Sequence, residues 1–568
     1  MIDQVIQNLK VTRADHLSVA AAFCHQMGLV ESINRVVPTQ MEMDVGSTVL
    51  AMVLDTLSGR NPLYRLADFF KFQDAEYLLG KTLPATAFND TTLGRTMDTI
   101  FDAGAEKMFN DVALQAVKQF PIDLNTVHFD TTSVNVWGAY DSETNLEDIL
   151  NITYGYSKDH RPDLKQFLIK MLCAGGNIPI MGSCEDGNAS DKTINNNILT
   201  RISKHMAQLG KPWGSYVYVA DSAMVTETNL AVIGKNLFIT RLPFTYKEAN
   251  QLVSEAVCEN QWHSIGTLNE TPATSKRPAA IYSCCEKKVT LYGQEYRAVV
   301  VYSSAHDKRR LKRMERDIKK SEIRFNKILS EAMKREYFCY ADAEAAVTKL
   351  MASKQDYHFF EAEVLEDVHY ARGRPRKDGS RKIVGTHYWV QGRVLPREDQ
   401  IKLKREESGC FILLTNVPLE GEHARKGHDV LLLYKEQHGI ERNFSFLKDP
   451  LIVNDLFLKK PQRIEALGAV LLIALLVKNL MEHVLRTYIS SQNETLMGWN
   501  NQQTTRPTTF MMTTKFYGIL ILNYMEKRAF ERPLSPVQLK YLKALGLTPN
   551  QLLYPGHTEK PKINTGKL

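Results

Sequence analysis

The sequence has few of the features that mark secreted, membrane-spanning or zinc-binding proteins. None of its eight cysteines forms a CxxC pair or lies beside a paired histidine; they stand at 24, 173, 184, 258, 284, 285, 339 and 410. This scatter argues against a structural zinc site and against a disulfide framework. The first ten residues, MIDQVIQNLK, lack the basic and then apolar pattern of a signal peptide. We therefore expect a cytoplasmic protein.

Long apolar runs are also scarce. The longest, Ala466 to Val477, spans twelve residues, whereas a membrane helix needs about 20. We expect this run to belong to a buried helix of the core, and we expect no membrane partner. The hydrophobic content of 44% and the charged content of 24% are those of an ordinary globular protein. A net charge of +7 indicates only a mild preference for polyanions.

The chain is long enough for several domains, and its pattern changes along its length. Residues 1–120 are expected to be all-α, whereas residues 121–242 alternate short β-rich runs with helices. Residues 243–408 are basic and are interpreted as an inserted α+β domain. The buried-strand pattern returns in residues 409–490, and residues 491–568 are expected to form a C-terminal helical region and tail. The predicted fold class is therefore a mixed α/β core with a large insertion.

Asp130 stands in the segment HFDTTSV, where its neighbours strongly favour an extended strand. An ionised carboxylate in a buried strand is costly unless a positive group pairs with it. The alternative is an aspartate at a strand edge with its carboxylate in water. Asp130 alone does not decide between a functional site and a surface position.

Asp221 ends a second strand-like run, SYVYVADSAMV, where apolar residues give way to small and polar ones. Carboxylates at strand ends point toward the crevice in which α/β proteins place their sites. The alternative is that Asp221 only caps a helix that begins at Ser222.

A third carboxylate lies in the segment DVLLLYKEQHGIERNFSFLKDP, which is predicted to form one helix from Asp429 to Lys448. Polar residues at offsets of 0, 3, 7 and 14 in this segment are Tyr434, Gln437, Glu441 and Lys448. In a regular helix a spacing of seven residues places side chains on one face. The alternative is a solvated polar stripe.

This spacing resembles the Y-x2-R-x3-E-x6-K signature of DDE transposases from bacterial insertion sequences, with Gln437 where the signature has arginine. Asp130 and Asp221 look like the first two catalytic aspartates of that family. The segments YGYSKDHRPDLKQ (residues 154–166) and GNASD (residues 187–191) are also similar to segments of these enzymes. The resemblance covers roughly residues 120–485, and the helical N-terminal region looks like that of one branch, where it would bind transposon ends.

The resemblance implies a cut-and-paste transposase with an RNase H-like catalytic core. Asp130, Asp221 and Glu441 would be the catalytic residues and would hold two Mg²⁺ or Mn²⁺ ions about 3.5–4 Å apart. Hydrolysis at a transposon end would give a 3′-hydroxyl that attacks target DNA at the same site. The expected partners are double-stranded DNA, as terminal inverted repeats and target, and a second copy of the chain in a homodimer.

Two groups of residues are expected to bind DNA. Tyr434, Gln437 and Lys448 would lie beside the scissile phosphate, as the resemblance implies. The segment ARGRPRKDGSRK (residues 371–382) resembles the core of an AT-hook, which lies in a narrow A·T minor groove. We prefer phosphate binding without sequence choice, and a merely solvated loop is the alternative. The DNA-binding residues predicted in this segment are Arg372, Arg374, Arg376 and Lys377.

Two other functions are compatible with the same residues. One is an RNase H-like nuclease that cleaves DNA without strand transfer. The other is a non-catalytic DNA-binding protein derived from a transposase, which the presence of all three carboxylates disfavours. Trp137 and Trp213 stand near the two aspartates, and we expect both to pack in the core; stacking on a displaced base is the alternative.

Overall fold

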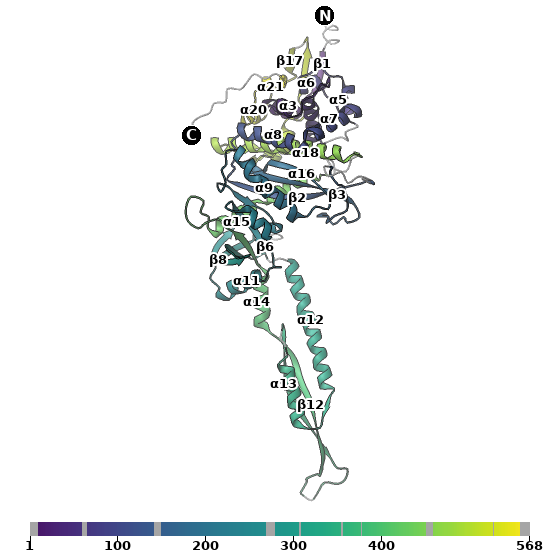
Figure 1. Ribbon diagram of the computed structural model, residues 1–568, viewed down its shortest axis with the longest axis vertical. Coiled ribbons are helices and arrows are strands. Elements are labelled where there is room, and N and C mark those ends of the chain that lie inside the picture. The colour runs from purple at the N-terminus through teal and green to yellow at the C-terminus, as the bar shows by residue number, and fades with distance from the viewer. Residues whose placement is uncertain are drawn as a thin grey trace. The chain divides into compact units, whose positions relative to one another are not determined.

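The structure is a computed structural model of the 568-residue chain. It describes residues 9–59, 65–140, 149–268, 279–305, 308–353, 356–376, 378–449, 458–525 and 527–556. The chain divides into two compact units. The core unit comprises residues 1–240, 416–424 and 433–568, and the insertion unit comprises residues 241–415 and 425–432. Both helices and strands are abundant, so the predicted mixed α/β class is confirmed (Figure 1).

The strands of the core unit follow one another in the order β4-β3-β2-β5-β6. Their bounds are β2 (Thr126–Val136), β3 (Lys165–Ala174), β4 (Ile178–Glu185), β5 (Val217–Val219) and β6 (Leu237–Leu242). Strands β2, β3 and β4 are antiparallel neighbours, and β5 runs parallel to both β2 and β6. Strand β3, with the sequence KQFLIKMLCA, is buried along almost its whole length. A strand that is buried on both faces has a nearly continuous apolar sequence, so the sequence pattern predicts these strands.

Helices dominate the first 120 residues. They are α2 (Leu17–Gln26), α3 (Leu29–Val36), α4 (Val45–Leu57), α5 (Leu66–Phe72), α6 (Ala75–Leu79), α7 (Asp90–Ala103) and α8 (Ala105–Gln119). Asn89 caps α7, because its Oδ1 accepts the N–H of Thr92 at 3.0 Å. Helix α4 starts at Val45, with Asp44 as its cap. An unpaired helix start is costly, and Asp44 satisfies the N–H of Ser47.

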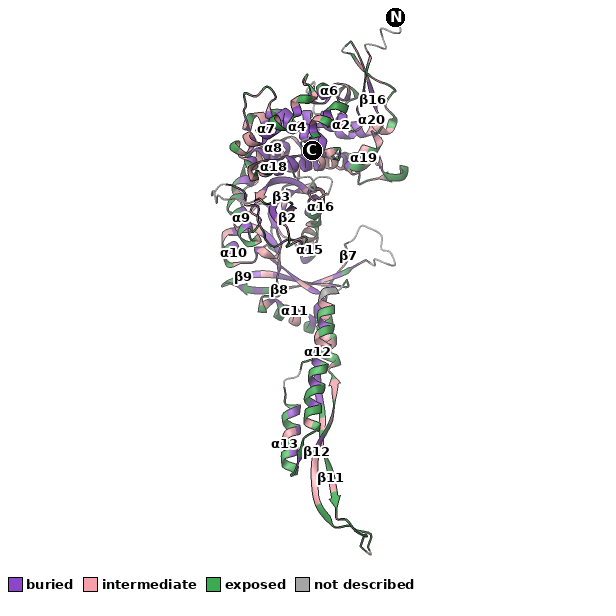
Figure 2. Ribbon diagram, turned by 90° about the vertical axis from the view of Figure 1, so that its right-hand side faces the viewer, coloured by how far each residue is buried: buried purple, intermediate pink, exposed green. Residues whose placement is uncertain are grey.

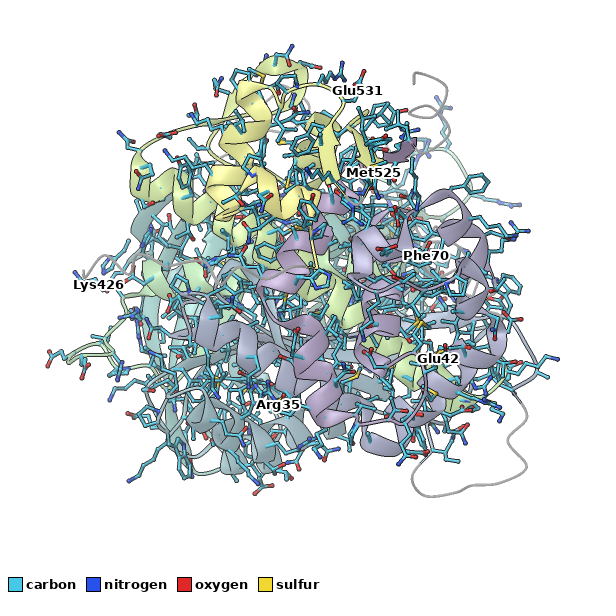
Figure 3. The ribbon with its side chains drawn as sticks, turned by 90° about the horizontal axis from the view of Figure 1, so that it is seen from above. Arg35, Glu42, Phe70, Lys426, Met525 and Glu531 are labelled. Atoms are coloured by element: carbon cyan, nitrogen blue, oxygen red, sulfur yellow. The ribbon has the colours of Figure 1, made fainter. Side chains whose placement is uncertain are left out.

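The prediction that this region is all-α is wrong in one respect. Strand β1 (Leu9–Arg13) pairs antiparallel with β16 (Leu520–Tyr524), which in turn pairs with β17 (Lys527–Phe530). The partner strand is contributed from the far end of the chain, so no local pattern predicts the pairing. In Figure 3 the C-terminal segment that carries Met525 and Glu531 lies beside the N-terminal helices, where Phe70 is labelled.

Helix α18 (Pro461–Gln492) is the central helix of the core unit. It contacts α4, α7, α8 and β4, and Figure 2 shows it buried. Among the described residues it alone is long and apolar enough to cross a membrane, yet 89% of its apolar window is buried inside the molecule. The prediction of a buried core helix is confirmed. Other elements of this unit are α9 (Asp191–Gln208), α10 (Glu227–Ile233), α19 (Thr509–Lys515), α20 (Pro536–Leu545), α21 (Pro549–Leu553), β14 (Leu496–Met497) and β15 (Gln503–Thr504).

The insertion unit contains a run of antiparallel strands and an extended hairpin. These strands follow one another in the order β13-β9-β8-β7 within the nine-stranded sheet, with β7 (His263–Thr267), β8 (Ile281–Leu291), β9 (Gln294–Ser303) and β13 (Cys410–Thr415). The long hairpin of β11 (His358–Tyr370) and β12 (Ile383–Pro396) packs on α12 (Lys308–Met333) and α13 (Tyr340–Met351) around a small core that contains Phe325 and Phe360 (Figure 1). The remaining elements are α11 (Lys247–Glu259), α14 (Glu398–Ser408) and β10 (Glu336–Tyr337).

Candidate active site

Asp130 and Asp221 meet at the same edge of the core sheet. Strands β2 and β5 are parallel, with His128 opposite Val219. Continuing this register by two residues brings Asp130 level with Asp221. The carboxyl ends of neighbouring parallel strands share one edge, which is where α/β proteins place their sites.

Backbone and hydroxyl groups hold both aspartates. The Oδ1 of Asp130 accepts the N–H of Thr131 at 2.7 Å. The Oδ1 of Asp221 accepts the N–H of Ala223 at 3.1 Å, so Asp221 does cap a short turn, η4 (Ser222–Met224). Its carbonyl oxygen accepts the hydroxyl of Thr240 at 2.6 Å. The capping alternative is therefore true of the local structure, and it also fixes the carboxylate at the strand end.

The same neighbours shift the pKa values of the two aspartates. Burial raises the pKa of Asp130 to about 6; Asp221 and Asp191 also raise this pKa, and Lys158 lowers it. Burial likewise raises the pKa of Asp221, with a further increase from Asp191 and an opposing influence of Lys158. Burial and like charges disfavour the ionised form of a carboxylate. Such shifted groups cluster at functional sites, so this edge is the candidate active site.

Two residues without a predicted role complete this cluster. The Nζ of Lys158 lies 3.7 Å from Oδ1 of Asp130 and 3.5 Å from Oδ2 of Asp191. Asp191 begins α9, and its Oδ1 accepts the hydroxyl of Thr131 at 2.5 Å. Lys158 and Asp191 belong to YGYSKDHRPDLKQ and GNASD, the two segments in which the sequence is similar to the transposases. The missing information was their proximity to Asp130, which depends on how distant segments pack.

The prediction of one continuous helix from Asp429 to Lys448 is wrong. Helix α15 (Gly427–Glu436) ends before Gln437, and α16 (His438–Leu447) begins after it. The N–H of Gln437 donates to the carbonyl of Tyr434, and the N–H of Ile440 donates to that of Gln437. Each of these hydrogen bonds spans three residues, whereas those of an α-helix span four, so the turn is tighter here. The seven-residue spacing of Tyr434 and Glu441 therefore spans a junction between two helices and not one regular helix.

Gly439 lets the first turn of α16 approach the β3–β4 turn closely. A Cβ on this buried glycine would lie 1.6 Å from Oδ1 of Asn177, so only glycine permits the close approach. Asn177, with φ of 62°, ends the short turn η3 (Gly175–Asn177) between β3 and β4. A glycine inside a helical pattern is the sequence signal that would have predicted the break between α15 and α16.

Buried amides anchor α16 to its neighbours. The Nδ2 of Asn443 donates to the carbonyl of Asn177 at 2.8 Å. The Nδ2 of Asn479, from α18, donates to the same carbonyl and to Oδ1 of Asn443, both at 2.8 Å. A satisfied buried network fixes the position of the elements that contribute to it. It therefore sets where Glu441 stands on α16.

Glu441 is not part of the aspartate cluster in this structure. Its helix contacts β2, but its side chain is 66% exposed, and its Oε2 lies 3.2 Å from Nδ1 of His438. Within the described residues no group of three or more His, Cys, Asp or Glu side chains is placed to hold a metal ion. Asp130 and Asp221 are oxygen donors of the kind that Mg²⁺ and Mn²⁺ prefer. The predicted ligand type fits, and the structure brings together two of the three predicted ligands.

Lys448 is engaged in an ion pair. Its Nζ lies 2.7 Å from both carboxylate oxygens of Asp159, the residue that follows Lys158. A DNA phosphate would have to compete with Asp159 for this ammonium. Gln437, at the start of α16, is partly buried, as is Tyr434.

The basic segment of the insertion unit joins the strands of the long hairpin. Arg372, Arg374 and Arg376 are all exposed, whereas Lys377 lies outside the described residues. Across the loop, the N–H of Ala371 donates to the carbonyl of Lys382 at 2.8 Å. We name residues 371–382 the basic tip.

The expectation for the two tryptophans is wrong. Trp137 is 65% exposed and Trp213 is 62% exposed, so neither packs in the core. Trp137 follows the last residue of β2, and the guanidinium of Arg161 lies 5.3 Å from its ring centroid. Trp213 precedes β5 in a turn that contains Gly214, with φ of 81°. Each tryptophan lies beyond the buried part of its strand, so the apolar pattern alone gave a false prediction.

A comparison with protein families finds a match in the N-terminal region. The model of a domain of unknown function, DUF4277, matches residues 9–114. This domain is found in transposase-like proteins. No curated protein matches the sequence of the chain. The match covers the helical N-terminal region and does not extend to the candidate active site.

Proposed function

We propose that this chain is a DDE-type transposase that cleaves DNA at transposon ends and transfers the strand into target DNA, in a cut-and-paste reaction. The observation that carries the proposal is the pair of partly buried carboxylates of Asp130 and Asp221 at the ends of parallel strands, both with a raised pKa. The match of residues 9–114 to a domain found in transposase-like proteins supports the same assignment. In this proposal the mixed sheet of the core unit is an RNase H-like core.

The carboxylates would hold two Mg²⁺ or Mn²⁺ ions. When bound, these ions would neutralise charge on the transferred phosphate and assist formation of the attacking hydroxide. Asp130 and Asp221 would supply oxygen ligands from the sheet edge, with Asp130 oriented by the N–H of Thr131. Glu441 would join them by rotation of its exposed side chain on α16, whose backbone the buried amides hold in place. Loss of the proton from Asp130 would accompany binding, because a carboxylate must be ionised to act as a ligand.

Other residues of the chain would position DNA. Lys448 would exchange its partner Asp159 for a backbone phosphate, since both are anionic oxygen acceptors. The arginines of the basic tip would bind phosphates of the duplex. A homodimer holding two transposon ends is part of the proposal, with one active site in each chain.

The test is DNA cleavage and strand transfer by the full chain with its own terminal repeats and Mg²⁺. Asp130→Asn, Asp221→Asn and Glu441→Gln should each reduce both products by at least about a thousandfold while end binding persists. Glu227→Gln, which changes an exposed glutamate shortly after Asp221, is the matched control and should react like the wild type.

The outcomes separate the alternatives. Cleavage without joined product would identify a nuclease, and end binding without either product in the wild type would identify a non-catalytic binder. Substantial activity in one of the three carboxylate variants would remove that residue from the proposed site.

A further inference from the structure

Lys158 lies between two carboxylates of the candidate active site without forming a close ion pair with either. Its Nζ is 3.7 Å from Oδ1 of Asp130 and 3.5 Å from Oδ2 of Asp191. Its shorter contacts are to neutral groups, since it donates to the carbonyl of Thr131 at 2.7 Å and to the hydroxyl of Thr131 at 2.6 Å. The ammonium is therefore held in place by Thr131 and shared by the two carboxylates.

Asp191 fixes this arrangement from the start of α9. Ser190 caps the helix by accepting the N–H of Thr193, which places Asp191 in the first turn. The Oδ1 of Asp191 accepts the hydroxyl of Thr131 at 2.5 Å. A hydroxyl has one hydrogen, so donation to Asp191 leaves its lone pairs for the ammonium of Lys158. Asp191 thus holds Lys158 directly by charge and indirectly through Thr131.

The position of the ammonium has a consequence for cation binding. It is the positive charge next to Asp130, which the proposed function makes a metal ligand. A divalent cation on the same carboxylate would repel it, because like charges about 4 Å apart in a partly buried site interact strongly. The side chains of Lys158, Asp130 and Asp191 are 28%, 21% and 31% exposed, so an ion from solution can reach them.

We propose that Lys158 is the resident counter-cation of Asp130, and that Asp191 is a positioning residue that receives the ammonium when a divalent cation binds. The inference rests on the proposed function, because it takes Asp130 as a metal ligand. The displaced ammonium stays within the site, paired with Asp191, where it can donate to a DNA phosphate. Lys158 therefore lowers the affinity for divalent cations in the absence of DNA.

The experiment is Mn²⁺ binding to the full chain without DNA, measured by isothermal titration calorimetry at one fixed neutral pH. Lys158→Met should tighten Mn²⁺ binding about tenfold or more, because it removes a positive charge within 4 Å of a ligand. Lys158→Arg keeps the charge and should bind Mn²⁺ nearly as the wild type does. Lys192→Met, which removes an exposed cation next to Asp191, controls for general electrostatic effects and should change the affinity less than twofold or so.

Asp191→Asn tests the positioning role. Without Asp191 the ammonium has Asp130 as its closest carboxylate, so Mn²⁺ should bind several-fold more weakly, by roughly three- to tenfold. In the Lys158→Met background the same change should have a much smaller effect, since there is no ammonium left to position. A purely structural role for Asp191 would give equal effects in both backgrounds.

Two results would overturn the inference: Lys158→Met binding Mn²⁺ no more tightly than the wild type, or equal effects of Asp191→Asn in the two backgrounds. Asp130→Asn and Asp221→Asn separate this failure from that of the proposed function. If those variants lose Mn²⁺ binding while Lys158→Met leaves it unchanged, only the role of Lys158 is wrong. If they bind Mn²⁺ like the wild type, the metal site itself is wrong.

Discussion

The carboxylate site of the core unit and the basic tip of the insertion unit gather charge in opposite ways. At the site, Asp130 is partly buried near Asp221 and is surrounded by Thr131, Lys158 and Asp191. At the tip, Arg372, Arg374 and Arg376 are exposed on a loop between two strands. Burial makes each charge at the site depend on its neighbours, whereas water screens the charges at the tip.

This difference determines how each region responds to substitution. A change at the site alters packing, protonation and the position of other functional groups together, so its effects are large and coupled. A change at the tip should alter only the attraction to a polyanion, so its effects should be smaller and should depend on salt. Four predictions, given in order of the expected effect, extend this contrast between buried and exposed groups to other positions of the chain.

The largest effect is expected from Gly439→Ala in α16. The new Cβ would lie 1.6 Å from Oδ1 of Asn177, so the Asn177 side chain, α16 or the β3–β4 turn must move. We expect a loss of about 2–3 kcal/mol in the free energy of unfolding, typical of overpacking. Strand transfer should fall more than tenfold because Glu441 moves with α16. Differential scanning calorimetry and the strand-transfer assay measure the two effects.

Gly385→Ala in strand β12 of the hairpin is the matched control. The nearest atom to its added Cβ is 3.8 Å away, on His387, so the free energy of unfolding should change by less than about 0.5 kcal/mol. Equal stability of the two glycine variants would contradict the close approach of Gly439 to Asn177.

The second effect concerns the pH dependence of stability. Burial, with the carboxylates of Glu106, Glu185 and Asp186, raises the pKa of Glu465 on α18 to about 7, and Lys170 opposes them. The folded state therefore binds a proton more tightly than the unfolded state, and Glu465 destabilises the fold progressively as the pH rises from about 4.5 to 7. Glu465→Gln should raise the free energy of unfolding by roughly 1–3 kcal/mol at pH 8 and should change it little below pH 4.5.

Thermal unfolding of the wild type and Glu465→Gln across this pH range makes the measurement. Glu363→Gln, at an exposed position of β11 in the hairpin, is the control and should leave the pH profile unchanged. Parallel profiles for the wild type and Glu465→Gln would mean that Glu465 does not titrate in this window.

The third prediction addresses the basic tip. Replacing Arg372, Arg374 and Arg376 together by Ala should weaken DNA binding and leave the thermal midpoint unchanged. If each arginine contacts one phosphate, the slope of log K against log salt should shrink by roughly 0.9 per residue. Fluorescence anisotropy with duplexes of differing A·T content gives the slope and the sequence dependence.

Three exposed lysines elsewhere in the insertion unit, Lys327, Lys334 and Lys349, provide the control when changed together to Ala. An equal loss in both triple variants would show a general charge effect. A loss confined to A·T-rich DNA would establish minor-groove binding, and an unchanged slope would mean that the tip is only solvated.

The smallest effect is expected from Gln437→Arg, which restores the arginine of the transposase signature. At the junction of α15 and α16 the new guanidinium should add one phosphate contact and steepen the salt slope by roughly 0.9. Its charge near the start of α16 should cost only a few tenths of a kcal/mol. Coincident salt slopes for the wild type and Gln437→Arg would show that this position does not face DNA.

The elements that the sequence predicted correctly are those in which local pattern and burial agree. Strands β2, β3 and β4 and the buried helix α18 appear in the sequence as apolar runs of the right length. These features depend on neighbours in the sequence, which is why they could be predicted.

The failures come from contacts between distant segments. The pairing of β1 with β16 and the close approach of Gly439 to Asn177 both depend on residues hundreds of positions away. The presence of Lys158 and Asp191 beside Asp130 has the same origin, because three separate segments meet there. The spacing of Tyr434, Glu441 and Lys448 correctly predicted a helical region. The structure divides this region into α15 and α16 at Gln437, which the spacing did not predict.

The central claim is that Asp130, Asp221 and Glu441 form one metal-dependent site for DNA chemistry. Its most direct test is a crystal structure of the full chain with a transposon-end duplex and Mn²⁺, in which anomalous scattering locates the ions. The account predicts Mn²⁺ within bonding distance of carboxylate oxygens of Asp130 and Asp221, with the Glu441 side chain turned away from His438 toward the ions and the scissile phosphate. Mn²⁺ bound elsewhere, or Glu441 still paired with His438 in a complex competent for cleavage, would contradict it.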